Sequence, residues 1–186
     1  MFTKTEIRDL IISVIALALI FSSFRVELIL ITLFVVIVVF LSHELSHKFL
    51  AQYYGCDAEY KMWPLGLFLG LITALIPGGF VIAAPGAVYI SPYKKKFAFR
   101  VARLTRKQYA LVSLAGPLIN IILAIFLLLL NFFYPLELFT LTASVSFFLA
   151  FFNLLPIPPM DGSKIMSWNL KIWLLVTAIA FVGLFI

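Results

Sequence analysis

Charged residues are scarce in this chain, and their scarcity excludes an ordinary soluble domain. Of 186 residues, 12% are charged and 64% are hydrophobic, and the mean hydropathy is +1.15. A soluble globular domain has about 25% charged residues. The composition therefore indicates an integral membrane protein. Because no polar stretch is long enough to form an appended soluble domain, we expect a single domain over residues 1–186.

Cysteine and histidine are almost absent as well. The single cysteine, Cys56, excludes an internal disulfide, and the two histidines both lie in the motif His43-Glu44-Leu45-Ser46-His47. Residues four apart share one face of a helix, so both imidazoles can point at one metal ion. Glu44 is offset by about 100° around such a helix, where it can reach a water on that metal without being a ligand.

The motif lies in an apolar stretch long enough to cross a bilayer, where ionisable groups are costly and indicate function. A catalytic zinc usually has three protein ligands and one open position. Apart from Glu44, the only acidic residue in an embedded position is Asp161. It follows Pro156, Pro158 and Pro159, which unwind the preceding helix and let a short side chain reach sideways. Asp161 could instead cap the next helix, although capping and metal binding are compatible.

The apolar segments predict an all-α bundle of about five transmembrane helices. These segments cover residues 7–24, 28–54, 108–131, 136–152 and 171–186, and a short interfacial helix is expected over 163–169. Residues 64–90 are also apolar, but they contain many glycines and prolines. We therefore expect a re-entrant hairpin there, which could be a β-hairpin, packed against the helices.

The distribution of basic residues predicts the orientation. If 64–90 is re-entrant, nearly all lysines and arginines fall on one side, including seven between 91 and 107. The positive-inside rule places that side in the cytoplasm. We therefore expect a multi-pass protein of the cell membrane, with the N-terminus and active-site side cytoplasmic and the C-terminus outside. The basic stretch is then a loop at the lipid surface, and nucleic-acid binding is not expected.

Two motifs together resemble the site-2 protease family of intramembrane zinc metalloproteases. They are His43-Glu44-x-x-His47 on a membrane helix, and Asn153-x-x-Pro156-x-Pro158-x-x-Asp161-Gly162 after a later one. Residues 115–120 resemble the start of the family's third core helix, and residues 77–79 its glycine-rich hairpin. The resemblance covers about 28–165. Ser46 departs from the family's usual glycine, a change between small residues.

The resemblance implies an intramembrane endopeptidase with one Zn²⁺ ion held by His43, His47 and Asp161. It also implies that Glu44 is the general base and that Asn153 stabilises the oxyanion, although Asn153 could simply cap a helix end. We expect Asn120 to be a polar residue of helix packing. The implied substrates are transmembrane segments of other membrane proteins, cut in regulated intramembrane proteolysis.

Three other functions fit part of the pattern. A divalent-metal transporter or sensor could use the same His and Asp ligands, but it would not need Glu44. A non-catalytic membrane scaffold would not need the complete ligand set. An enzyme that clips prenylated C-termini would more typically take a glutamate from a later helix. The sequence leaves open the substrate, the oligomeric state, and whether cobalt or iron replaces zinc.

Overall fold

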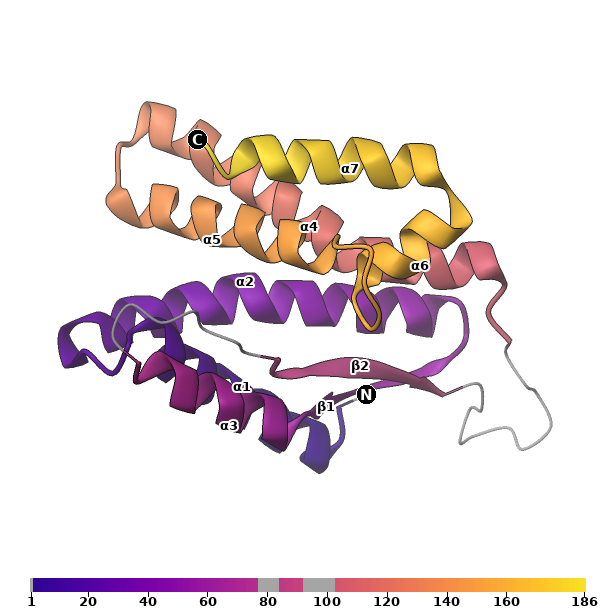
Figure 1. The fold of residues 1–186 in the computed structure, drawn as a ribbon, viewed down its shortest axis with the longest axis horizontal. Helices are drawn as coiled ribbons and strands as arrows, with labels where there is room; N and C mark the ends of the chain where they lie inside the picture. Colours follow the sequence, from indigo (N-terminus) through magenta and orange to yellow (C-terminus); the bar gives the residue numbers. More distant parts are fainter. Residues whose placement is uncertain (1, 77–83, 92–102) are drawn as a thin grey trace.

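The computed structural model describes residues 2–76, 84–91 and 103–186 (Figure 1). In chain order, the elements of these residues are α1 (Lys4–Phe21), α2 (Val26–Tyr53), β1 (Asp57–Met62), α3 (Pro64–Ala74), β2 (Gly86–Ser91), α4 (Arg106–Phe133), α5 (Glu137–Asn153), α6 (Asp161–Trp168) and α7 (Leu170–Gly183).

The long helix α2 lies between two layers. On one side are α1, α3 and the two strands, and on the other side are α4, α5, α6 and α7 (Figure 1). Helix α4 packs closely against both α2 and α5. The second layer has a core of small and aliphatic residues, among them Ala124, Ala150 and Ala180, which are fully buried. Small residues let helices approach closely, and these three come from α4, α5 and α7.

Two of the described helices are long and apolar enough to cross a membrane. Helices α2 and α4 each have 28 residues, with mean hydropathies of 2.6 and 2.5 over their most apolar windows. At 1.5 Å per residue, each is about 42 Å long, which exceeds the hydrocarbon thickness of a bilayer. Helices α5 and α7 are shorter apolar helices. The structure is thus mostly helical with two candidate spans, while the count of five spans stays a prediction.

Residues 64–90 do not form one continuous span. Helix α3 has 11 residues, or about 16 Å, which is too short to cross a bilayer. The predicted re-entrant hairpin falls partly on residues 77–83, including the Pro77-Gly78-Gly79 segment, and these lie outside the described residues. Most of the basic stretch, at 92–102, lies outside them too.

The expected all-α class requires a correction, because the fold contains a small antiparallel sheet. Strand β2 does not pair within 64–90 but with β1, in a register that runs from Asp57 opposite Ser91 to Met62 opposite Gly86. In β1, Ala58 and Tyr60 are buried while Lys61 is exposed. This alternation is typical of a strand, but the segment is short and its partner is distant in sequence.

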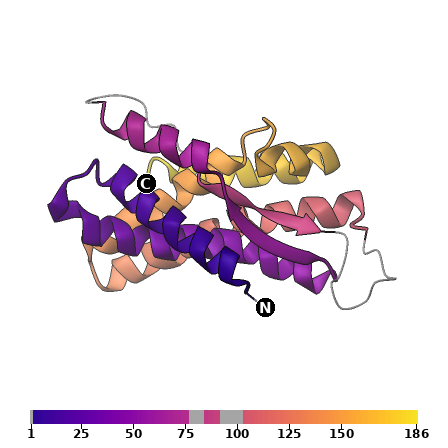
Figure 2. The same ribbon diagram turned by 90° about the horizontal axis from the view of Figure 1, so that it is seen from below.

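Buried charges at the start of α1 hold the sheet against the helices. Glu6 forms an ion pair with Lys48 of α2, and its Oε1 accepts a hydrogen bond from the Tyr60 backbone N–H at 3.0 Å. Asp9 Oδ2 accepts from the Met62 N–H at 3.3 Å. Figure 2 shows α1 and the sheet side by side. The polar residues of α1 therefore fix β1 in place beside α2.

The predicted break after the fourth apolar helix is confirmed. Helix α5 ends at Asn153, and no regular helix forms until α6 begins at Asp161. The three prolines of this segment explain the break, because proline lacks an N–H and disfavours helix at the residue before it. Helix α6 also matches the short helix predicted near residues 163–169. The break turns the chain so that Asp161 faces α2.

Candidate active site

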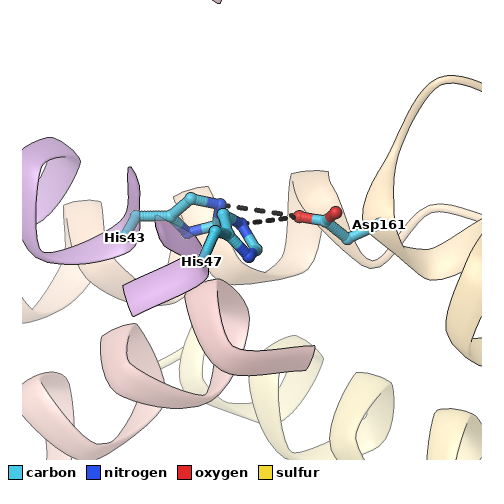
Figure 3. Close-up of side chains that lie close together, drawn as sticks. All are labelled: His43, His47 and Asp161. Atoms are coloured by element: carbon cyan, nitrogen blue, oxygen red, sulfur yellow. Dashed lines mark ion pairs between the residues drawn. The ribbon is translucent and has the colours of Figure 1, made fainter. Parts of the chain in front are cut away.

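The three predicted ligands come together between α2 and α6. His43 and His47 are buried on one face of α2, with ring centroids 4.7 Å apart. Both rings direct Nε2 toward the same oxygen of Asp161, at 3.6 Å for His43 and 3.1 Å for His47 (Figure 3). Among the described residues, these three form a group able to hold a metal ion.

The distances from the two imidazole nitrogens to the Asp161 oxygen fit a tetrahedral metal. Metal–nitrogen and metal–oxygen bonds of about 2.0–2.1 Å at tetrahedral angles put neighbouring ligand atoms about 3.3 Å apart. The two distances to Asp161 Oδ2, 3.1 and 3.6 Å, bracket that value. Two imidazoles and one carboxylate leave the fourth position of a catalytic zinc open. The geometry and the donor set therefore both fit Zn²⁺.

Gly116 of α4 leaves room for the metal. A Cβ at this position would lie 2.3 Å from His47 Nε2 and 2.6 Å from His43 Nε2. Any side chain would therefore fill the space in front of the two nitrogens. A glycine inside a helix costs about 1 kcal/mol relative to alanine, and here it keeps the site open. Gly116 lies in the segment 115–120 that the sequence singles out, but the sequence alone assigns it no role at the metal.

Helix α4 also fixes the orientation of His47. His47 Nδ1 lies 2.7 Å from the backbone oxygen of Val112. A carbonyl oxygen can only accept, so Nδ1 carries the hydrogen and donates it to Val112. The lone pair is then on Nε2, the nitrogen that faces Asp161. An outer contact of this kind is typical of metal-binding histidines, because it sets the tautomer and the ring angle.

Asp161 uses its two oxygens for different neighbours. Oδ2 faces the histidines, while Oδ1 lies 3.3 Å from Nζ of Lys164, one helical turn further along α6. The Lys164 ammonium therefore lies beside the oxygen that does not face the histidines. Asp161 would bind a metal as the ionised carboxylate.

Glu44 is a buried carboxylate with an unsatisfied oxygen. Its side chain is 8% exposed, and Oε2 has no hydrogen-bond partner among the described residues. Leaving a buried polar group unpaired costs about 1–3 kcal/mol, and more for a charged group. A group kept in this state beside a metal site is typical of a residue that exchanges a proton with a reactant.

Asn153 and Asn120 are placed differently from one another. Asn153 is the last residue of α5, and its Nδ2 donates to the backbone oxygen of Leu149 at 2.9 Å. This helix-end contact is the alternative that the sequence left open, and a role at the oxyanion stays a prediction. Asn120, expected only to pack between helices, contacts His43 Nδ1 at 3.2 Å.

Comparison with known proteins agrees with this site. The model of peptidase family M50 matches residues 30–136 and 132–176. "Putative zinc metalloprotease MJ0611" of Methanocaldococcus jannaschii is 43% identical over 182 residues, which cover 94% of this chain and 90% of that protein. "Putative zinc metalloprotease YwhC" of Bacillus subtilis is 35% identical over 148 residues, which cover 70% of this chain and 65% of that protein. No solved structure matches the chain.

The family match extends over most of the chain, and the matched residues include His43, Glu44, His47 and Asp161. The resemblance seen in the two motifs is therefore confirmed by the whole sequence, and the chain belongs to peptidase family M50.

Proposed function

We propose that this protein is an intramembrane zinc endopeptidase that cuts a peptide bond within or near the transmembrane segment of another membrane protein. Its class, zinc metalloprotease, follows from the family and from the names of its relatives. One observation carries the proposal further. The His, His and Asp group and the unpaired Glu44 lie together on and beside α2, a helix apolar and long enough to cross a bilayer.

Each residue of the site has a separate role in the proposed reaction. His43, His47 and Asp161 would hold Zn²⁺, which when bound acts as a Lewis acid and lowers the pKa of water from 15.7 to about 7. Glu44 accepts the proton of the attacking water at its unpaired Oε2 and returns it to the leaving amine. Asn153 has a second N–H beyond the one given to Leu149, and we assign it to the oxyanion.

The substrate must become extended near the cleaved bond, because a helix hides its carbonyls in internal hydrogen bonds. Strand β2 is suited to hold such a peptide. In the described part of the chain β2 pairs with β1 along one edge and packs near α2. A peptide that adds to the other edge would gain backbone hydrogen bonds without a fixed sequence. The proposed partners are therefore membrane proteins, single-pass ones among them, together with the bilayer itself.

The proposed location is the cell membrane, with several spans. Helices α2 and α4 support it by length and composition. The excess of lysine and arginine on one side supports a cytoplasmic N-terminus, a cytoplasmic active-site side and an outer C-terminus.

The proposal is tested by comparing purified wild type with Glu44→Gln on a panel of single-pass membrane proteins in detergent, with zinc measured in both. We expect cleavage to fall about 10²- to 10⁴-fold in the variant, because proton transfer is lost, while zinc content is unchanged. Glu27→Gln is a matched control, since Glu27 is exposed at the start of the same helix. Equal cleavage by wild type and Glu44→Gln would contradict the proposal.

A further inference from the structure

Asn120 is buried beside the metal site without being one of the ligands. It lies on α4 and is 0% exposed. Its Nδ2 lies 3.2 Å from Nδ1 of His43, and its Oδ1 accepts a hydrogen bond from Oγ of Ser42 at 3.4 Å. Ser42 Oγ in turn donates to the backbone oxygen of Val39 at 3.0 Å. The four groups form one chain of contacts that ends on a metal-binding imidazole.

The position of the hydrogen on His43 follows from its role as a ligand. Nε2 faces Asp161 Oδ2 and must offer a lone pair to a metal. A neutral imidazole has one hydrogen, which must then be on Nδ1. That N–H is buried and needs an acceptor. The Asn120 carboxamide lies within hydrogen-bond distance of Nδ1, and the backbone of Gly116 also interacts with the His43 ring.

Only one orientation of the carboxamide suits a His43 ring that carries its hydrogen on Nδ1. The oxygen and nitrogen ends of an asparagine have nearly the same shape, so their hydrogen bonds decide which end is which. If the carboxamide is turned over, so that Oδ1 rather than Nδ2 faces His43, Nδ1–H can donate to Asn120, the Asn120 N–H can donate to Ser42, and the Ser42 O–H donates to Val39.

The opposite orientation, with Nδ2 toward His43, does not suit a metal-bound ring. The carboxamide N–H would face His43 Nδ1 and force the imidazole hydrogen onto Nε2, where it blocks a metal.

We propose that Asn120 is a positioning residue that accepts the Nδ1 hydrogen of His43 through its Oδ1 and so holds Nε2 ready for the metal. This rests on the proposed function only in taking His43 as a zinc ligand. On this proposal, residues of α4 orient both histidine rings. Val112, Gly116 and Asn120 are spaced at four-residue intervals, and they respectively hold His47, leave room for the metal, and hold His43.

Two variants separate this role from simple packing. Asn120→Asp keeps an acceptor toward His43, whereas Asn120→Leu keeps the size but has no acceptor. We expect zinc affinity of the full-length protein in detergent, measured against a competing chelator, to fall about 10- to 100-fold in Asn120→Leu. In Asn120→Asp it should stay within a few-fold of wild type, because a carboxylate–histidine–metal arrangement is common.

A packing role predicts the opposite result. Leucine would then be tolerated, while a buried carboxylate would be costly. Retention of affinity in Asn120→Leu, or an equal loss in Asn120→Asp, would overturn the proposal. Both readings measure metal binding, so they hold even if no membrane substrate is cleaved.

A second measurement does not depend on any variant. The chain has two histidines, so nitrogen-15 spectra of histidine-labelled wild type contain only four ring signals. We expect a hydrogen on Nδ1 of His43 in the zinc-free protein. A His43 ring without a hydrogen on Nδ1 would overturn the assignment of Asn120 as the acceptor.

Discussion

The two halves of the metal site are built in different ways. His43 and His47 lie on a regular 28-residue helix and are held from α4 by Asn120 and Val112. Asp161 comes from the first residue of an eight-residue helix, after a proline-rich segment without helical structure. The first half is set by the packing of two long helices, and the second by the path of a short segment. The position of the two histidines is therefore fixed by helix packing. The position of Asp161 depends on where α6 packs.

The largest loss of zinc binding is expected from a side chain that fills the space in front of the two histidines. Gly116→Ala would put a methyl group 2.3 Å from His47 Nε2 and 2.6 Å from His43 Nε2. We expect zinc binding and cleavage to fall below detection. The contacts are with the ends of side chains, which can rotate away, and alanine favours a helix by about 1 kcal/mol over glycine. The thermal midpoint of the zinc-free protein should therefore stay near the wild-type value.

Gly183→Ala provides the control for that experiment. It also places a Cβ against an aromatic side chain, at 2.3 Å from Phe147, but on α7 and away from the ligands. Zinc content should match that of wild type. Full zinc binding by Gly116→Ala would show that the metal does not lie between these two nitrogens.

A smaller loss of zinc affinity is expected from a variant next to Asp161, Gly162→Ala. A Cβ at Gly162 would lie 2.0 Å from the backbone oxygen of Leu154 and 2.6 Å from that of Leu155. Backbone cannot rotate away as a side chain can, so Gly162→Ala must move α6 or the segment before it. We expect zinc affinity to fall about 10- to 100-fold, as for loss of an outer contact, together with a lower thermal midpoint. Chelator competition and thermal unfolding measure the two effects.

The contrast between the two glycine variants is itself the test. Gly116→Ala should lose metal at unchanged stability, whereas Gly162→Ala should lose both in part. If Gly162→Ala kept the zinc affinity of wild type, the position of α6 would not determine the position of Asp161. The two halves of the site would then not differ in the way described above.

The same division decides what could be predicted from the sequence. The histidine pair was visible because a four-residue spacing is a property of one helix. Asp161 was visible because prolines mark the break before it and few acidic residues are embedded. The long helices α2 and α4 were visible from their apolar runs. Each of these signals is local in sequence.

The parts that were missed depend on contacts between distant segments. Strand β1 is short, and its partner β2 begins 29 residues after β1 starts, so neither strand is distinct without the other. Gly116 and Asn120 have their roles only because α4 packs on α2. Glu6 precedes the first apolar run in the sequence, yet it is buried against Lys48. Sequence patterns do not show which faces of the helices and strands pack together. The roles of these residues depend on that packing.

The smallest effect is expected at Lys164, which contacts the outer oxygen of Asp161. Its Nζ lies 3.3 Å from Oδ1, and its side chain is 30% exposed. Partly exposed ion pairs contribute about 1 kcal/mol or less, so Lys164→Met should weaken zinc binding by roughly 3- to 5-fold. Lys171→Met is the control, since Lys171 is exposed at the start of α7.

The Lys164→Met variant measures how much the zinc affinity depends on the contact between Lys164 and Asp161. Asn120→Leu removes the partner of the fixed half and should have the larger effect on chelator competition. If Lys164→Met weakened zinc binding more than Asn120→Leu did, the order would be reversed. Orientation of the carboxylate, rather than of the histidines, would then limit metal binding in this site.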